Sequence, residues 1–373
     1  MNLREGKIGR QEGISLAAIA MCIGGLFTLD PEYTYSMGNA SYITLPAAAV
    51  ISLLLFLLIG ACMKRGDHEN LYCMIKDGCG SAIACIVSLI LVIGFALAAY
   101  APLASFVQIM HGLFFYGVGY RQILLYVMPG VLIIAWMGFE TIGRTAKCLF
   151  IILAAVTAIS LFAVLGEYES YRLYPIAGCG MQRMGLLSLS ETSAFLPAYT
   201  GILVCCSGMH GSKTMKSVGI RAGLIAGLIC ATVQLLLGMI FPYTQLQKFA
   251  MPLCRISHLS VEETNLTRLD KIAQVFWLNG SMLTGAFYIY AGSALFSRSF
   301  GIRDIRPVLA AVTVITSALI LMEFDGVFSK AEWAAKLWNE AGGAVFALPL
   351  LLVSLISLFK RKGNRRKSYE KTA

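Results

Sequence analysis

Ten apolar stretches, most of them about as long as a membrane-spanning helix, follow one another through this chain. They cover approximately residues 14–29, 41–63, 81–110, 122–138, 148–166, 185–209, 222–241, 272–297, 307–322 and 341–359. A bilayer core about 30 Å thick needs about 20 apolar helical residues, so each stretch can form one span. Hydrophobic residues make up 58% of the sequence and charged residues 13%, whereas soluble domains average about 45–50% and about 25%. We therefore expect an integral membrane protein and exclude a set of soluble domains.

The stretches are rich in glycine and alanine and lack the polar alternation of a membrane β-barrel, so helices are expected. Ten helices divide into five and five, which gives two repeats at approximately 14–166 and 185–359. Because five is odd, the second repeat crosses the membrane in the inverted sense. The sequence thus predicts one all-α transmembrane domain over residues 1–373, with a basic tail at 360–373.

The net charge of +10 is distributed unevenly along the chain. If both termini are cytoplasmic, 21 of the 30 Lys and Arg residues lie on the inner side, seven of them in the tail. This bias follows the positive-inside rule, so both termini are predicted to be cytoplasmic. Nucleic-acid binding is not expected, because no stacking aromatics interleave with the charges. A cleaved signal peptide is the alternative for the first span, but the nearest small-residue site, at 38–40, lies well beyond it.

Catalytic and metal-binding signatures are missing from the sequence. There is no phosphate-binding loop, no zinc-protease motif and no nucleophile elbow, so we expect neither an enzyme nor a cofactor. Most of the eleven cysteines fall inside spans, where they act as small hydrophobic residues, and no metal site is expected. Cys179 and Cys254 both fall on the predicted outer side, and whether they form a disulfide stays open.

Two predicted spans carry helix breakers. In the first, Gly24 and Gly25 lie near the middle and Pro31 follows at the outer end. In the sixth, Pro197 removes a backbone donor and clashes with the carbonyl four residues earlier, so the segment is expected to open around 193–197. When the first helix of each inverted repeat is discontinuous, its free backbone groups can bind a substrate at the membrane midplane. The alternative for the two glycines is close helix packing.

Several polar residues are candidates for function or for structure. Glu191 is the one carboxylate well inside a predicted span, where acids are expensive and often functional. The alternative is that it reaches the outer surface or pairs with Arg183 or Arg268. Glu140 and Arg144 are four residues apart and would pair across one helical turn, which favours a structural role. At the start of the eighth span, Asp270 would cap the helix, beside Arg268.

Three motifs then occur in a recognisable order. They are Gly138-Phe139-Glu140 followed by Arg144, Arg172-Leu173-Tyr174-Pro175-Ile176 with Gly178 and Gly180, and Thr267-Arg268-Leu269-Asp270 leading into Trp277. In these motifs, in its length and in its ten spans, the chain resembles the spore germination permeases. Those proteins are the B-type subunits of nutrient germinant receptors in endospore-forming bacteria, and they are related to the amino acid-polyamine-organocation transporters.

This resemblance implies a LeuT-like 5+5 inverted repeat with broken helices 1 and 6. It implies a small nutrient such as an amino acid as ligand, residence in the spore's inner membrane, and two partners, an A-type membrane subunit and a C-type lipoprotein. Carried onto this chain, the ligand pocket is lined by the broken middles of spans one and six, namely Gly24, Gly25, Leu26, Ser193, Ala194 and Phe195. The alternative function is a free-standing proton- or sodium-coupled amino-acid transporter with the same pocket.

Overall fold

The computed structural model describes residues 6–26, 38–174, 176, 178, 180–209, 211–246, 256, 269–324, 338 and 340–357. In this part of the chain the regular structure is helical, and extended pairing is limited to an isolated parallel bridge between Ile8 and Met209. The helices, in chain order, are α1 (Arg10–Leu26), α3 (Ser41–Gly66), α4 (Leu71–Cys79), α5 (Ser81–Ile109), α6 (Tyr120–Trp136), α7 (Phe139–Phe162), α8 (Met181–Ser190), α9 (Leu196–Val204), α10 (Ser212–Ile240), α11 (Tyr243–Leu246), α13 (Leu269–Phe300), α14 (Arg306–Phe324) and a last helix, Glu340–Ser357.

The length and apolar character of these helices confirm an integral, multi-pass membrane protein. Among the described residues, six stretches are long and apolar enough to cross a bilayer: Ser41–Gly66, Ser81–Gly112, Phe139–Phe162, Met181–Gly208, Ser212–Ile240 and Glu340–Ser357. Two shorter apolar helices, Tyr120–Trp136 and Arg306–Met322, coincide with further predicted spans, as do α1 and α13. All ten predicted spans therefore overlap helices, while ten as the number of crossings stays a prediction.

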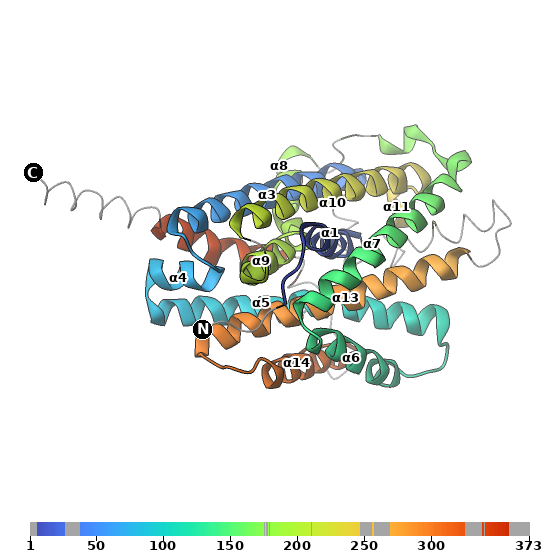
Figure 1. Ribbon diagram of the computed structural model, residues 1–373. Coiled ribbons are helices and arrows are strands. Elements are labelled where there is room, and N and C mark those ends of the chain that lie inside the picture. Colours follow the sequence, from blue (N-terminus) through green and yellow to red (C-terminus); the bar gives the residue numbers. More distant parts are fainter. Residues whose placement is uncertain are drawn as a thin grey trace, which may run out of the picture.

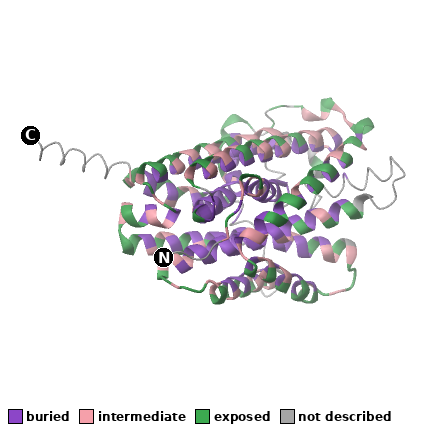
Figure 2. Ribbon diagram, viewed as in Figure 1, coloured by how far each residue is buried: buried purple, intermediate pink, exposed green. Residues whose placement is uncertain are grey.

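α1 and α9 lie at the centre of the bundle (Figure 1), with α3 and α10 along one side and α5 and α13 along the other. α6 and α14 lie outside α5 and α13. Burial follows this arrangement, since α1 and α9 are buried along most of their length whereas the outer helices bury one face only (Figure 2). Large apolar side chains such as Leu54, Ile93 and Leu228 are exposed on the outer helices, as expected for contact with lipid.

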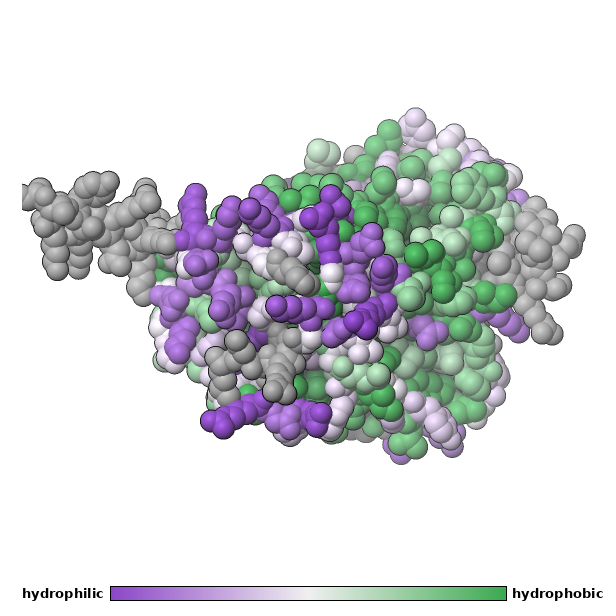
Figure 3. Space-filling model, viewed as in Figure 1, coloured by the Kyte–Doolittle hydropathy of each residue, from purple (hydrophilic) through white to green (hydrophobic). Residues whose placement is uncertain are grey.

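One end of the bundle is polar. Hydrophilic side chains gather over the end that carries α4, and hydrophobic side chains cover much of the rest of the visible face (Figure 3). No span is predicted between residues 63 and 81, but a short helix forms there, and Asn70 caps it by accepting a hydrogen bond from the Cys73 N–H at 3.0 Å. Leu71, Met74 and Ile75 form the buried face of this amphipathic helix. An N-cap followed by apolar residues at i, i+3 and i+4 was the sequence signal for it.

Candidate functional site

The sixth predicted span is interrupted in the middle of the bundle. A single 3-10 turn, η5 (Glu191–Ala194), separates α8 from α9. Pro197 lies in the first turn of α9, where its missing N–H would have had no acceptor within the helix. Hydroxyl groups also bond to nearby carbonyls, as Thr192 Oγ1 does to the Leu189 carbonyl at 2.6 Å. The break expected around 193–197 is present and begins two residues earlier.

Glycines from two other helices approach this turn closely. A methyl group built on Gly24 of α1 would lie 2.5 Å from the carbonyl oxygen of Ala194 and 3.0 Å from its Cα. On Gly343 of the last helix, a methyl group would lie 3.0 Å from the Leu189 carbonyl oxygen and 3.2 Å from the Ser193 nitrogen. Both helices therefore contact the backbone of the break at a distance that only glycine permits. We call this junction of α1, η5 and the last helix the broken-helix junction.

Gly25 faces in another direction from its neighbour. A methyl group there would lie 3.2 Å from Cys230 Sγ on α10 and 3.4 Å from a methyl group of Leu45 on α3. Cys230 in turn contacts the Cys22 thiol. Close helix packing, which was the alternative for both glycines, describes Gly25 well, whereas Gly24 touches the break itself.

The other residues expected to line a pocket are also buried. Leu26 is buried at the end of α1 as the structure describes it, and Ser193 and Ala194 are buried in η5. Phe195 is fully buried and donates its N–H to the Thr192 carbonyl at 3.1 Å. The structure thus brings most of the predicted pocket residues to one place, although α1 and η5 are in direct contact there.

Glu191 is the first residue of the 3-10 turn, and within the described part of the chain it has no ion-pair partner. Its side chain is only 3% exposed, so it does not reach the surface. Among the described residues no hydrogen-bond donor reaches either carboxylate oxygen, and Arg183 is not a partner. The Thr44 hydroxyl faces this carboxyl group but donates a hydrogen bond to the Ser41 carbonyl at 3.4 Å. An unpaired carboxyl group at this depth is the most unusual feature of the site.

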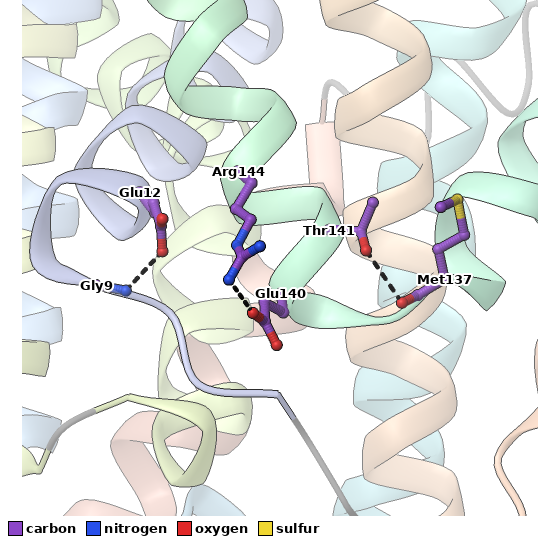
Figure 4. Close-up of polar contacts among 6 residues, drawn as sticks. All are labelled: Gly9, Glu12, Met137, Glu140, Thr141 and Arg144. Atoms are coloured by element: carbon purple, nitrogen blue, oxygen red, sulfur yellow. Dashed lines mark hydrogen bonds and ion pairs between the residues drawn. The ribbon is translucent and has the colours of Figure 1, made fainter.

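Glu140 and Arg144 form the ion pair expected from their spacing, at the start of α7. Both are at least partly exposed, and they lie beside the N-terminal segment, where the Gly9 N–H donates to Glu12 Oε2 at 2.7 Å (Figure 4). A methyl group on Gly6 would collide with the Glu140 side chain. This pair therefore belongs to the polar end of the bundle rather than to the broken-helix junction.

At the polar end, the N-terminal segment packs against residues that are distant in the sequence. Ile8 is fully buried, and its N–H donates to the Gly208 carbonyl at 3.0 Å. A methyl group on Gly208 would lie 2.9 Å from the ring of Phe139. Arg298, in the last turn of α13, donates to the Val204 carbonyl and, at 2.8 Å, to Ser207 Oγ. We call these contacts around Ile8, Phe139 and Gly208 the polar-end closure.

Some predicted residues cannot be placed in this site. Pro31, Arg268, Cys179 and Cys254 lie outside the described residues, and so does the side chain of Asp270, although its backbone belongs to α13. Whether Cys179 and Cys254 form a disulfide therefore stays open, and the helix cap at Asp270 stays a prediction. In the part of the chain that is described, no three His, Cys, Asp or Glu side chains are close enough together to hold a metal ion.

Two apolar cavities open on the sides of the bundle. One, of about 540 Å³, lies between α3, the broken span and the last helix, and Thr192 and Gly343 belong to its wall. The other, of about 250 Å³, lies between α1, α7, α10 and α13, and Cys22 and Trp277 line it. Both are lined mainly by aliphatic side chains, which suits contact with lipid chains better than binding of a polar solute.

Several solved transporters share this arrangement of helices. A substrate-bound, outward-open Na+-coupled sialic acid symporter has a TM-score of 0.64 at 11% identity, over 91% of this chain and 78% of the symporter. Mhp1, a nucleobase-cation-symport-1 family transporter in a closed conformation with bromovinylhydantoin bound, has a TM-score of 0.57 at 11% identity, over 96% and 95% of the two chains. The manganese transporter of Eremococcus coleocola has a TM-score of 0.51 at 13% identity, over 96% and 82%.

At these identities the likeness establishes the fold, which is the LeuT-like arrangement expected from the sequence, and the structures compared are transporters rather than enzymes. A search of curated protein sequences finds no match. Residues 12–327 match the family described as "Spore germination protein". That match includes α1, the broken span, the Gly138-Phe139-Glu140 motif and α13. The chain is therefore a membrane permease-like protein that belongs to the spore germination protein family.

Proposed function

We propose that this protein is the membrane subunit of a spore nutrient germinant receptor, which binds a small nutrient such as an amino acid and thereby triggers germination. The observation that carries the proposal is the direct contact between α1 at Gly24 and the interrupted span at Ala194. A ligand that enters between these two segments would separate them, and it would then bind backbone groups that are not used in helical hydrogen bonds.

Movement at this junction would be transmitted along α1 and α9, because both run through the centre of the bundle to the polar end. There Gly208, in the turn after α9, contacts Phe139 and Ile8. A shift of α9 would change the surface that the protein presents on that side. The partners proposed to respond to this change are an A-type membrane subunit and a C-type lipoprotein. The proposed location is the spore's inner membrane, with both termini of this chain cytoplasmic.

Ligand binding is tested on the purified protein in detergent with a panel of small amino acids, by thermal unfolding. A ligand present at about 100 times its dissociation constant stabilises the folded state by about 2.7 kcal/mol, which is easily detected as a rise in melting temperature. Buffer and a sugar of similar size serve as controls. No stabilisation by any amino acid in the panel would contradict the proposed ligand class.

A free-standing proton- or sodium-coupled amino-acid transporter is the second candidate. It is favoured by the likeness of the fold to symporters. The two functions differ in one measurement, which is uptake of a labelled amino acid into liposomes that contain this protein alone. Accumulation against the gradient, driven by a proton or sodium gradient, would establish the transporter and contradict a role limited to sensing.

A further inference from the structure

Glu191 carries an ionisable carboxyl group at a buried position, where its charged form is strongly disfavoured. It is the first residue of η5, it is 3% exposed, and both of its carboxylate oxygens are buried without a hydrogen-bond partner among the described residues. An ionised carboxylate removed from water is strongly destabilised unless a proton or a cation compensates it. The position of the group beside the Gly24–Ala194 contact links this requirement to the broken-helix junction.

Among the described residues, no cationic side chain pairs with Glu191. The groups that face it are the Thr44 hydroxyl and, at longer range, the thiol of Cys230. Within the described residues, Glu191 forms no ion pair with a Lys, Arg or His side chain. The negative charge of Glu191 must therefore be compensated by a proton or by a cation from outside the described chain.

An alkali-metal ion is a poor candidate for this position. Such ions need several hard oxygen ligands, whereas the nearby thiols of Cys22 and Cys230 are soft ligands and Thr44 offers one hydroxyl oxygen. An ammonium group needs fewer partners, because one carboxylate can accept two of its three hydrogen bonds.

We propose that Glu191 binds the ammonium group of the ligand, so that the ligand class is a small aliphatic molecule carrying a primary amine. The proposal rests on the proposed function, because it assigns a residue within the same junction. The aliphatic part would lie against Gly24 and Ala194, where small residues leave the least obstruction once α1 and η5 separate. Affinity for the amine then depends on the negative charge of Glu191 and not merely on its shape.

The test compares matched ligands on the full-length protein in lipid nanodiscs, in a buffer with choline as the cation. Alanine, alanine methyl ester, propionate and sodium chloride are titrated while thermal unfolding or calorimetry reports binding. Alanine and its methyl ester carry the ammonium group and propionate lacks it. We expect the two amines to bind and propionate to bind at least about tenfold more weakly, since a hydrogen bond to a charged group contributes about 1.5–3 kcal/mol.

Glu191→Gln keeps the shape of the side chain and removes its charge. This variant is expected to lose about 10- to 100-fold in affinity for alanine, while Glu191→Asp loses less. Glu69→Gln removes a carboxylate from an exposed residue after α3 and is expected to bind alanine as the wild type does. Ligand-free melting curves of each variant show that it is folded.

Each result decides between the two proposals. If wild-type protein binds alanine and Glu191→Gln binds it equally well, the role of Glu191 is wrong and the nutrient site stands. Equal binding of propionate and alanine by the wild type would also show that the role of Glu191 is wrong. This comparison does not depend on whether a variant folds. Stabilisation by sodium chloride alone that Glu191→Gln abolishes would replace the ammonium group by an alkali ion. If no amino acid binds the wild type, the proposed function fails together with this inference.

Discussion

At the scale of single residues, Gly24 is distinguished by packing against backbone atoms rather than side chains. The atoms that a side chain would meet there are the carbonyl oxygen and Cα of Ala194, at 2.5 and 3.0 Å. Backbone atoms cannot rotate aside as a side chain can, so α1 and η5 would have to move apart. At Gly25 the neighbours are the Cys230 sulfur and Leu45, which can shift. A side chain is therefore expected to be more disruptive at Gly24 than at Gly25.

Gly24→Ala is expected to reduce the free energy of unfolding by about 1–3 kcal/mol, as overpacking does elsewhere, and to reduce the response to ligand. Gly25→Ala is expected to have a smaller effect. Thermal unfolding of the purified variants measures both. Gly185→Ala is the control, because this exposed position in α8 has no atom within 4 Å of the added methyl group. A Gly24→Ala protein as stable as the Gly185→Ala control would contradict the close contact.

Glu191→Gln makes a second prediction that needs no ligand. Because the carboxyl group is buried without a described partner, neutralising it removes a destabilising charge and leaves the shape unchanged. We expect the ligand-free variant to unfold at a temperature equal to or higher than that of the wild type. A loss of more than about 2 kcal/mol would instead indicate a native partner whose removal leaves a buried group unpaired.

The sequence identifies Gly24 and Glu191 because a glycine pair or an acid inside an apolar run is visible within a few residues. It could not identify Gly343, Thr44 or Cys230 as their neighbours. These residues belong to the last helix, to α3 and to α10, and they are ordinary for membrane helices. Their importance comes from contacts between distant segments, which no local pattern contains.

At the scale of elements, the Gly138-Phe139-Glu140 motif acquires a physical explanation. Gly138 has φ of 91°, a conformation that favours glycine, and it places Phe139 as the first residue of α7. The ring of Phe139 is buried against Gly208 and stacks on Tyr290 at 5.9 Å. The motif therefore starts α7, and its Phe139 ring packs against Gly208 in the turn after α9, within the polar-end closure.

Removing this ring should open the polar-end closure. Phe139→Ala is expected to cost about 3–5 kcal/mol, as for other buried Phe→Ala changes, and to expose the adjacent turn after α9. Cys205 and Cys206 in that turn are buried and can report the change through their reactivity with N-ethylmaleimide, measured by mass spectrometry of the peptide. The control is Phe162→Ala, at an exposed position in α7. Unchanged labelling in Phe139→Ala would show that other contacts close this end.

Elements were predictable where their signal is local. Long apolar runs identified the helices, and Pro197 with its neighbouring hydroxyls identified the break, because both act through the backbone of the same segment. α4 was missed because a helix of nine residues with a narrow apolar face differs little from a loop in overall hydropathy. The polar-end closure was missed for another reason: it joins the N-terminal segment to residues about 200 positions away.

At the scale of the whole molecule, several basic residues lie near helix ends on one side of the bundle. Lys64 and Arg65 lie in the last turn of α3, Lys76 in that of α4, and Arg298 in that of α13. Hydrophilic side chains gather at this end of the bundle (Figure 3). The positive-inside rule then predicts that this end faces the cytoplasm, together with both chain termini.

Terminal reporter fusions test that orientation in a bacterial host. A fluorescent protein at either terminus is expected to fluoresce, because it folds in the cytoplasm, and alkaline phosphatase at the same positions is expected to be inactive, because its disulfides form only in an oxidising compartment. Replacing the seven Lys and Arg residues of the tail by Gln should weaken this preference without reversing it, since 14 further basic residues remain on the same predicted side. Active phosphatase at the C-terminus, with a fluorescent N-terminus, would require an odd number of crossings and would contradict the two inverted repeats of five.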